Sequence, residues 1–319
     1  MEFVNNSRDA APDLRVNIGG SLTIANPVMT ASGTFGYARE FEQLMNLHRL
    51  GAVIVKGISL YPRQGNPPPR IVETPCGMLN AIGLQNVGVE RFIAEKMVYL
   101  AGLNIPVIVN ILGDSLDEYR EITEKLAGVE GVAGLEVNIS CPNVKKGGVA
   151  FGTDPAMAMA VTKAVKERAD VPVMVKLSPN VSDITVMAKS VEDGGADAIS
   201  LINTLIGMAV DVKTRKPVLG NIIGGLSGPA IKPIALRMVY QVAGCVSVPV
   251  IGIGGIENSE DALEFLLAGA SAVQIGTASF VNPRASEEVV EGISAYVTAE
   301  KLPSVRSLIG ALDVGLIEI

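Results

Sequence analysis

Short apolar runs of strand length alternate with longer amphipathic stretches along most of the chain. The runs are rich in Val and Ile, which is typical of buried strands, and eight of them predict strands. These are residues 27–32, 52–56, 106–112, 134–140, 172–178, 198–204, 249–254 and 272–277. Several of the runs begin at a proline, as at Pro106, Pro172 and Pro249, so one βα unit recurs along the chain.

The stretches between these runs predict helices. Residues 154–168, 182–193 and 259–268 carry Asp or Ser at or near the start, where a side-chain oxygen can cap a helix. A glycine or another turn signal separates each helix from the next strand. Near the N-terminus, residues 14–26 predict a small hairpin with Gly19 and Gly20 at its turn.

Eight strands separated by helices predict an α/β fold, a (β/α)8 TIM barrel formed by residues 1–319 as a single domain. The alternative is an open doubly wound sheet, but no glycine-rich dinucleotide turn follows the first strand. Two connections exceed the usual length, residues 57–88 after the second strand and 205–228 after the sixth. Long loops on the active face of a barrel tend to be functional, so we expect both near the site.

The charge balance argues against two classes of partner. The 319 residues are 48% hydrophobic and 18% charged, with a net charge of −7, so no basic surplus is present to neutralise nucleic-acid phosphates. The N-terminus has no apolar signal core, and no apolar run is long enough to span a bilayer. We therefore expect a soluble cytoplasmic protein that binds neither nucleic acid nor membrane.

The few cysteines and the single histidine narrow the chemistry. Cys76, Cys141 and Cys245 are far apart and odd in number, which suggests neither a disulfide framework nor a metal site. His48 lies in a predicted helix and is expected on its surface, so a Ser-His-Asp triad and a histidine-rich zinc site are both disfavoured. A proton-transfer step would then use Cys, Lys, Asp or Glu.

The predicted strand at residues 134–140 runs directly into a cysteine. Polar residues Glu136 and Asn138 alternate with apolar ones in it, and Pro142 stops the strand just after Cys141. Residues 143–148 are rich in lysine and glycine, and we expect them to form a lid. An isolated cysteine before a turn is usually structural, so only its surroundings can indicate chemistry.

The carboxyl ends of the eight strands, where a barrel places its active site, carry an unusual set of residues. They are Ser32, Lys56, Gly57, Asn110, Asn138, Cys141, Lys176, Asn203, Thr204, Gly254, Gly255, Gly276 and Thr277. Packing alone gives a barrel rim no reason to collect lysines and carboxamides. We therefore expect a binding site there, with Cys141 as a candidate base, because nearby lysines shift a thiol towards thiolate.

Glycine-rich segments at the last strands indicate a phosphate site. Residues 252–255 and 275–277 present backbone N–H groups at strand ends that lead into helices, and residues 224–228 can add further donors. Barrels commonly bind phosphate after strands seven and eight. The phosphate-bearing ligand would therefore sit beside the other strand-end residues.

The remaining strand-end residues indicate what else binds. Lys176 lies among apolar neighbours and needs a negative partner, which an anionic ring such as a reduced flavin would supply. The carboxamides of Asn80, Asn138 and Asn203 suit a planar ring with alternating N–H and C=O groups. A pyrimidine is such a ring.

Two segments are specific enough to indicate a family. Residues 77–86 read Gly-Met-Leu-Asn-Ala-Ile-Gly-Leu-Gln-Asn, and residues 138–143 read Asn-Ile-Ser-Cys-Pro-Asn. With the proline- and arginine-rich residues 62–70, they resemble dihydroorotate dehydrogenase, and the resemblance runs from about residue 14 to 296. It implies oxidation of dihydroorotate to orotate in de novo pyrimidine (UMP) biosynthesis. FMN would accept a hydride from C6 while Cys141 removes a proton from C5.

The resemblance also assigns residues to each ligand. Orotate would contact Lys56, Asn80, Ala81, Ile82, Gly83, Leu84, Asn138, Asn203 and Thr204. FMN would contact Ser32, Lys56, Gly57, Asn110, Asn138, Lys176, Ile202, Gly228, Gly254, Gly255, Gly276 and Thr277. Lys176 would stabilise the negative charge of the reduced flavin. The chain departs from its relatives at Gly57, where Ala or Ser is common, and after Asn86, where a proline is expected.

The segment from Glu73 to Asn86 is similar to the NAD-linked type 1B catalytic subunit. Such subunits pair with an electron-transfer subunit that carries FAD and a 2Fe–2S cluster, in a heterotetramer with two chains of each kind. Three scattered cysteines could not hold that cluster in this chain alone. The apolar N-terminal extension and the serine base of membrane-bound members are both missing from the sequence.

Several alternatives remain open from the sequence. Within the same chemistry, they are a fumarate-using type 1A homodimer and a barrel like that of dihydropyrimidine dehydrogenase, which uses cysteine as an acid. From other classes, they are a lyase or aldolase that forms a Schiff base at Lys56 or Lys176, and an FMN-binding scaffold without activity.

Overall fold

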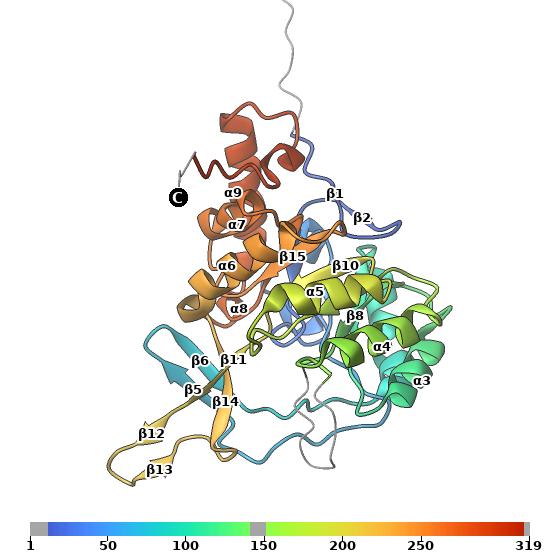
Figure 1. Cartoon of the computed structure of the whole chain (residues 1–319), viewed down its shortest axis with the longest axis vertical. Coiled ribbons are helices and arrows are strands. Elements are labelled where there is room, and N and C mark those ends of the chain that lie inside the picture. The colour runs from blue at the N-terminus through green and yellow to red at the C-terminus, as the bar shows by residue number, and fades with distance from the viewer. Residues whose placement is uncertain (1–11, 141–150, 316–319) are drawn as a thin grey trace, which may run out of the picture.

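The protein is described from a computed structural model, which describes residues 12–140 and 151–315. Eight parallel strands pair in the order β3-β16-β15-β10-β9-β8-β7-β4 and form the centre of the molecule (Figure 1). Their bounds are β3 Val28–Thr30, β4 Val53–Ile54, β7 Val107–Ile111, β8 Val132–Asn138, β9 Val173–Lys176, β10 Ala198–Leu201, β15 Val250–Ile253 and β16 Ala272–Ile275. All eight predicted strands are confirmed; seven are shorter than predicted, and β8 has the predicted length but begins two residues earlier.

The barrel closes between β3 and β4, where few backbone groups pair. Met29 bridges Ala52 in parallel, and the Gly51 N–H donates to the Val28 carbonyl at 2.9 Å. Further along the two strands, a side chain joins them by hydrogen bonds. The Thr30 hydroxyl accepts from the Ile54 N–H at 2.9 Å and donates to the Ile54 carbonyl at 3.2 Å. The fold is therefore a (β/α)8 barrel, as the alternation of apolar runs predicts.

Helices cover the outside of the barrel (Figure 1). They are α3 Leu116–Leu126, α4 Pro155–Lys166, α5 Ile184–Asp193, α6 Lys232–Ala243, α7 Ser259–Leu267, α8 Ala278–Val281 and α9 Ala285–Ala299. Between β4 and β7 runs one helical segment, from α1 Val89–Arg91 through a π-helical turn to α2 Val98–Leu100. Asp154 and Asp183 cap α4 and α5 as predicted, because their carboxylates accept from the first backbone N–H groups.

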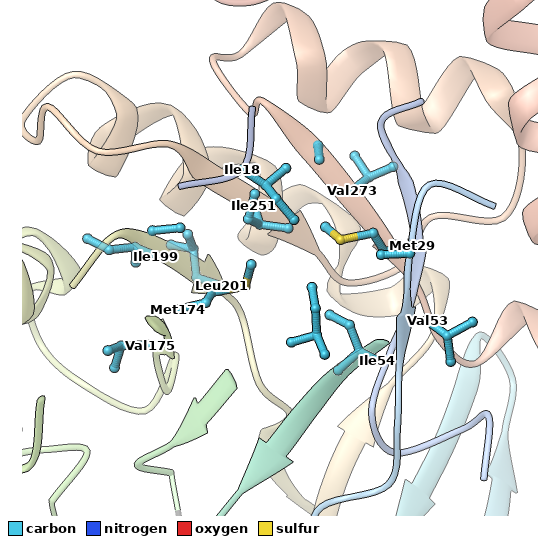
Figure 2. Packing of buried hydrophobic residues seen from close by; sticks show 14 of the residues in the cluster. Ile18, Met29, Val53, Ile54, Met174, Val175, Ile199, Leu201, Ile251 and Val273 are labelled. Carbon is cyan, nitrogen blue, oxygen red and sulfur yellow. The ribbon is translucent and has the colours of Figure 1, made fainter. Parts of the chain in front are cut away.

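Branched and sulfur-containing side chains fill the space inside the strands (Figure 2). Met29, Ile54, Met174 and Ile251 are all buried there. The hairpin of β1 Val16–Asn17 and β2 Thr23–Ile24 lies against the amino ends of β9 and β10, since Gly20 is close to Pro172 and Gly19 to Asp197. A Cβ on Gly19 at the hairpin turn would lie 2.5 Å from the Asp197 carbonyl oxygen, just before β10, so only glycine allows this contact. The hairpin closes the end of the barrel opposite the predicted site.

The two long connections, which were predicted as loops, contain strands. Together they form an antiparallel sheet in the order β11-β14-β6-β5, with a β12–β13 hairpin at its end (Figure 1). The bounds are β5 Ile71–Thr74, β6 Gly77–Asn80, β11 Leu205–Met208, β12 Val210–Asp211, β13 Lys216–Pro217 and β14 Ile223–Ser227. β14 pairs with β6, so the connections after β4 and β10 hold one another beside the carboxyl ends of the strands.

Two smaller predictions concern the rest of the surface. His48 is exposed on a short 3-10 helix, Leu47–Arg49, in agreement with its expected place on a helix surface. Within residues 12–140 and 151–315, no helix is long and apolar enough to cross a membrane.

The seam at Thr30 gives a test of the fold. Thr30→Val keeps the side-chain volume but leaves the N–H and carbonyl of Ile54 without their Thr30 partner in a buried strand. Each buried polar group left without a partner costs about 1–3 kcal/mol. We expect the free energy of unfolding to fall by about 2–4 kcal/mol in urea titrations.

Thr162→Val is the matched control. Thr162 is equally buried, but its hydroxyl only donates to the Ala158 carbonyl one turn earlier in α4. That bond contributes little to a helix, so the control should cost less than about 1 kcal/mol. Equal losses in the two variants would show that the hydroxyl does not close the barrel.

Candidate active site at the carboxyl ends of the strands

The predicted site residues form a buried floor and a partly exposed rim. The buried members are Ser32, Ala81, Asn110, Asn138, Lys176, Ile202, Gly228 and Gly254. The partly or fully exposed ones are Lys56, Gly57, Asn80, Ile82, Gly83, Leu84, Asn203, Thr204, Gly255, Gly276 and Thr277. A ligand can therefore approach from the mouth of the barrel and meet polar groups below. Cys141, the lid at residues 143–148 and their surroundings lie outside the described residues.

Asn138 and Asn203, which the sequence predicts to share a ligand, are hydrogen-bonded to each other. The Asn203 Nδ2 atom donates to Asn138 Oδ1 at 3.3 Å, and the Ser140 N–H donates to the same oxygen at 3.1 Å. The buried Tyr119 hydroxyl donates to the Asn138 carbonyl at 2.8 Å and holds the end of β8. The two carboxamides are thus positioned as one unit by the ends of β8 and β10.

A residue without an assigned role lies at the centre of the floor. Glu136 is fully buried, and its carboxylate accepts from Asn110 Nδ2 at 2.6 Å, Ser200 Oγ at 2.9 Å and Gln274 Nε2 at 2.6 Å. The Lys176 ammonium lies 3.9 Å from the same carboxylate. Glu136 and Asn138 alternate with apolar residues in the sequence, which predicts that both lie on the same face of β8. This pattern was the one sequence signal that could have drawn attention to Glu136. Its four partners on four other strands could not be read from the sequence.

Lys56 lies at the rim, after β4. Burial lowers the pKa of its amine, the positive charge of Arg70 lowers the pKa further, and the Glu40 carboxylate acts in the opposite direction. Arg70 itself donates to Gln85 Oε1 at 2.6 Å. Two cations beside one opening fit an anionic ligand, because the anion would offset both charges. The proline- and arginine-rich segment thus contributes Arg70, which sequence reasoning did not assign to the site.

The glycine-rich segments predicted to bind phosphate converge. A Cβ on Gly255 would lie 2.9 Å from the Gly228 carbonyl oxygen, and a Cβ on Gly228 would lie 2.7 Å from Gly77 Cα. The Thr277 hydroxyl donates to Ser227 Oγ at 2.8 Å. The ends of β14, β15 and β16 therefore meet at one place, as an anion site at the last two strands requires.

The floor also fits a flat ring with hydrogen-bonding edges. Asn110 Oδ1 is buried and accepts no hydrogen bond from the described residues, because the amide nitrogen is turned to Glu136. A Cβ on Gly57 would lie 2.7 Å from this oxygen, so glycine leaves the acceptor open. Glycine at position 57, where Ala or Ser is common in the family, is therefore compatible with the proposed site.

The loop at residues 81–86 is held in place by asparagines that sequence reasoning missed. Asn66 donates from Nδ2 to the Ala81 carbonyl at 2.9 Å, and Asn86 donates to the Leu84 carbonyl at 2.9 Å and to Ser59 Oγ at 2.7 Å. Asn80 precedes this loop on β6, with its Nδ2 atom 3.4 Å from the Gly225 carbonyl. The predicted substrate loop is thus fixed at both ends.

Asn180 holds the second long connection, which follows β10, in place. Its Nδ2 atom donates to the Thr204 carbonyl at 3.0 Å, and its Oδ1 atom accepts from the Ile206 N–H at 3.0 Å. The amide of Asn180 therefore ties the end of β10 to the first strand of the projecting sheet. Within the described residues, no cluster of three or more His, Cys, Asp or Glu side chains could hold a metal ion.

Fold and site together define an α/β-barrel enzyme with lysine and arginine at the rim and a polar floor. A family model described as dihydroorotate dehydrogenase matches residues 13–297. The chain is 61% identical over 302 residues to a protein of Pelobacter propionicus and 60% identical over 302 residues to one of Citrifermentans bemidjiense. Each alignment covers 95% of this chain and 99% of the relative, and both relatives are named catalytic subunits of dihydroorotate dehydrogenase B (NAD(+)).

A protein of Geobacter sulfurreducens with the same name is 57% identical over 303 residues. The chain therefore belongs to the dihydroorotate dehydrogenase family. It is an oxidoreductase of the family that oxidises dihydroorotate in pyrimidine biosynthesis, in agreement with the reaction that the residues at 77–86 and 138–143 indicate.

The charge environment of Lys56 gives a second test. Arg70→Gln removes a positive neighbour that disfavours the ammonium form, so the pKa of Lys56 should rise. Acetylation needs the neutral amine, so its rate increases as pH rises through the pKa. Competitive acetylation of Lys56, read by mass spectrometry, should therefore show its rise at higher pH in Arg70→Gln than in wild type.

Arg63→Gln is the control, because Arg63 pairs with Asp114 at 2.8 Å and does not contribute to the lowered pKa of Lys56. Its acetylation curve should match that of wild type. A curve that is unchanged in Arg70→Gln would contradict the placement of Arg70 beside the Lys56 amine.

Proposed function

We propose that the protein uses FMN at the barrel mouth to oxidise dihydroorotate to orotate, with Cys141 as the general base. The proposal is supported above all by the joined carboxamides of Asn138 and Asn203, which lie at the same edge as Lys56 and the converging glycines. The family membership supports the substrate. We treat residues 1–319 as a single catalytic domain.

The residues present fit FMN. Gly228, Gly254, Gly255, Gly276 and Thr277 would hold its phosphate by backbone N–H groups, which favour an anion at strand ends. Ser32, Lys56, Gly57, Asn110, Asn138, Lys176 and Ile202 would surround the ring. When bound, FMN supplies the redox chemistry by accepting a hydride from C6 of the substrate.

Dihydroorotate would be held by groups at the rim. Lys56 would pair with its carboxylate, while Asn80, Asn138, Asn203 and Thr204 offer donors and acceptors to the ring N–H and C=O groups. Backbone groups of residues 81–84 would complete the contacts. Cys141 would take the proton from C5, since a thiolate near lysines is a competent base at neutral pH.

We also propose that the electrons leave through a second subunit that carries FAD and a 2Fe–2S cluster and reduces NAD. The name "catalytic subunit" of the relatives supports a separate partner. Two catalytic and two electron-transfer chains would form a heterotetramer. We expect this complex in the cytoplasm.

Replacement of the base tests the chemistry. Cys141→Ser should retain bound FMN but lose about 10²–10⁴-fold in the rate of flavin reduction by dihydroorotate at neutral pH, because a hydroxyl is a much weaker base. Stopped-flow absorbance under anaerobic conditions measures this rate. Cys245→Ser, the same change at the end of α6, is the control and should reduce at the wild-type rate. Rapid reduction in Cys141→Ser would remove Cys141 from the role.

The electron acceptor separates the closest alternatives. The isolated chain should turn over poorly with fumarate, and co-expression with the electron-transfer subunit should add dihydroorotate-dependent NAD reduction. Rapid fumarate-dependent turnover by the isolated chain would indicate a type 1A enzyme instead. Faster oxidation of dihydrouracil than of dihydroorotate would indicate a barrel like that of dihydropyrimidine dehydrogenase.

A further inference from the structure

Glu136 is a buried carboxylate whose partners come from the strands around it. Besides the hydrogen bonds from Asn110, Ser200 and Gln274, it has the Lys176 ammonium at 3.9 Å. These four partners belong to β7, β10, β16 and β9. Every partner is a donor, so the group is suited to be a negatively charged acceptor.

Stability alone does not explain such a pair. A buried ion pair is often no more stabilising than apolar residues of the same volume, because both charges must leave water. Apolar groups fill the neighbouring part of the barrel interior, where Met29, Met174 and Ile251 are buried. The charge of Glu136 therefore indicates a role in ligand binding or chemistry at the mouth of the barrel.

The register of the strands places the two charges at different depths. Lys176 pairs with Asn138, and Glu136 precedes Asn138 by two residues on the same face of β8. Two residues of a strand span about 6.6 Å, so Glu136 lies behind Lys176 as seen from the mouth. The Lys176 side chain is only 7% exposed, and within the described residues Glu136 is the only carboxylate that forms an ion pair with it.

The contact with Asn110 has a second effect. Because the amide nitrogen of Asn110 donates to Glu136, its oxygen is turned away and is left as an open acceptor beside Gly57. Glu136 thus positions two groups of the proposed flavin site, the Lys176 ammonium and the Asn110 carbonyl. Because it would act through these two groups, Glu136 is a positioning residue.

We propose that Glu136 is the counter-charge that offsets Lys176 and thereby sets how strongly the site favours the negatively charged, reduced form of FMN. This inference rests on the proposed FMN site. Together the two side chains carry no net charge, so the site stabilises the reduced flavin less than Lys176 alone would. Removal of either charge should therefore shift the flavin equilibrium, in opposite directions.

The experiment is an anaerobic redox titration of FMN-loaded protein against a dye of known potential. Glu136→Gln keeps the shape and removes the negative charge, so the ratio of reduced to oxidised flavin at fixed dye potential should rise about tenfold or more. Lys176→Met should lower the ratio. The double variant Glu136→Gln/Lys176→Met again has no net charge and should lie between the two single variants, near wild type.

Ser200→Ala is the matched control, because it removes a 2.9 Å hydrogen bond to Glu136 without a change in charge. Its ratio should stay within about twofold of wild type, since no unit charge is lost. An unchanged or lower ratio in Glu136→Gln would overturn the proposal. A shift in Ser200→Ala as large as that in Glu136→Gln would also overturn it, because the effect would then follow packing and not charge.

Two features keep the test decisive. If Glu136→Gln does not fold or bind FMN, the double variant still contains no lone buried charge, and its ratio compared with Lys176→Met isolates the charge of Glu136. No increase in that comparison would overturn the proposal. Bleaching of wild-type FMN by dihydroorotate tests the proposed function separately. A chain that binds FMN but is not bleached contradicts that function, while the dye titration still measures the effect of Glu136.

Discussion

The structure depends on one buried carboxylate. Glu136 can remain charged inside the barrel only if the surrounding strands supply donors, and Asn110, Lys176, Ser200 and Gln274 do so from four of them. This requirement constrains the relative position of the strands that carry these residues. Since side chains alternate along a strand, a shift of one residue would turn the partners out of the barrel. The polar floor and the barrel register thus depend on each other.

The rim is built on that floor by the two insertions. The chain leaves β4 and β10, forms the projecting sheet, and returns with Asn80 opposite Gly225 and with Gly77 against Gly228. The predicted substrate loop after Asn80 and the predicted phosphate contact at Gly228 are therefore both joined to the projecting sheet. The side chains of Asn66, Asn86 and Asn180 donate to backbone carbonyl groups of its loops, so these loops are held by the protein's own hydrogen bonds.

Local patterns predicted the barrel well because they act over a few residues. The eight runs that form the barrel strands are mostly apolar, and Asp154 and Asp183 cap their helices within one turn. The projecting sheet was missed, because β6 and β14 pair across about 145 residues and β14 contains two glycines. No local signal distinguishes such short strands from loops.

The sequence by itself determined the eight strands, the set of residues at their carboxyl ends and, through residues 77–86 and 138–143, the family. These are properties of short segments and of their order along the chain. Only the tertiary structure decided which side chains meet. It joined Asn138 to Asn203, placed Arg70 near Lys56, and gave Glu136 partners from residue 110 to residue 274. Contacts between distant segments depend on barrel closure and register, and no single segment encodes either.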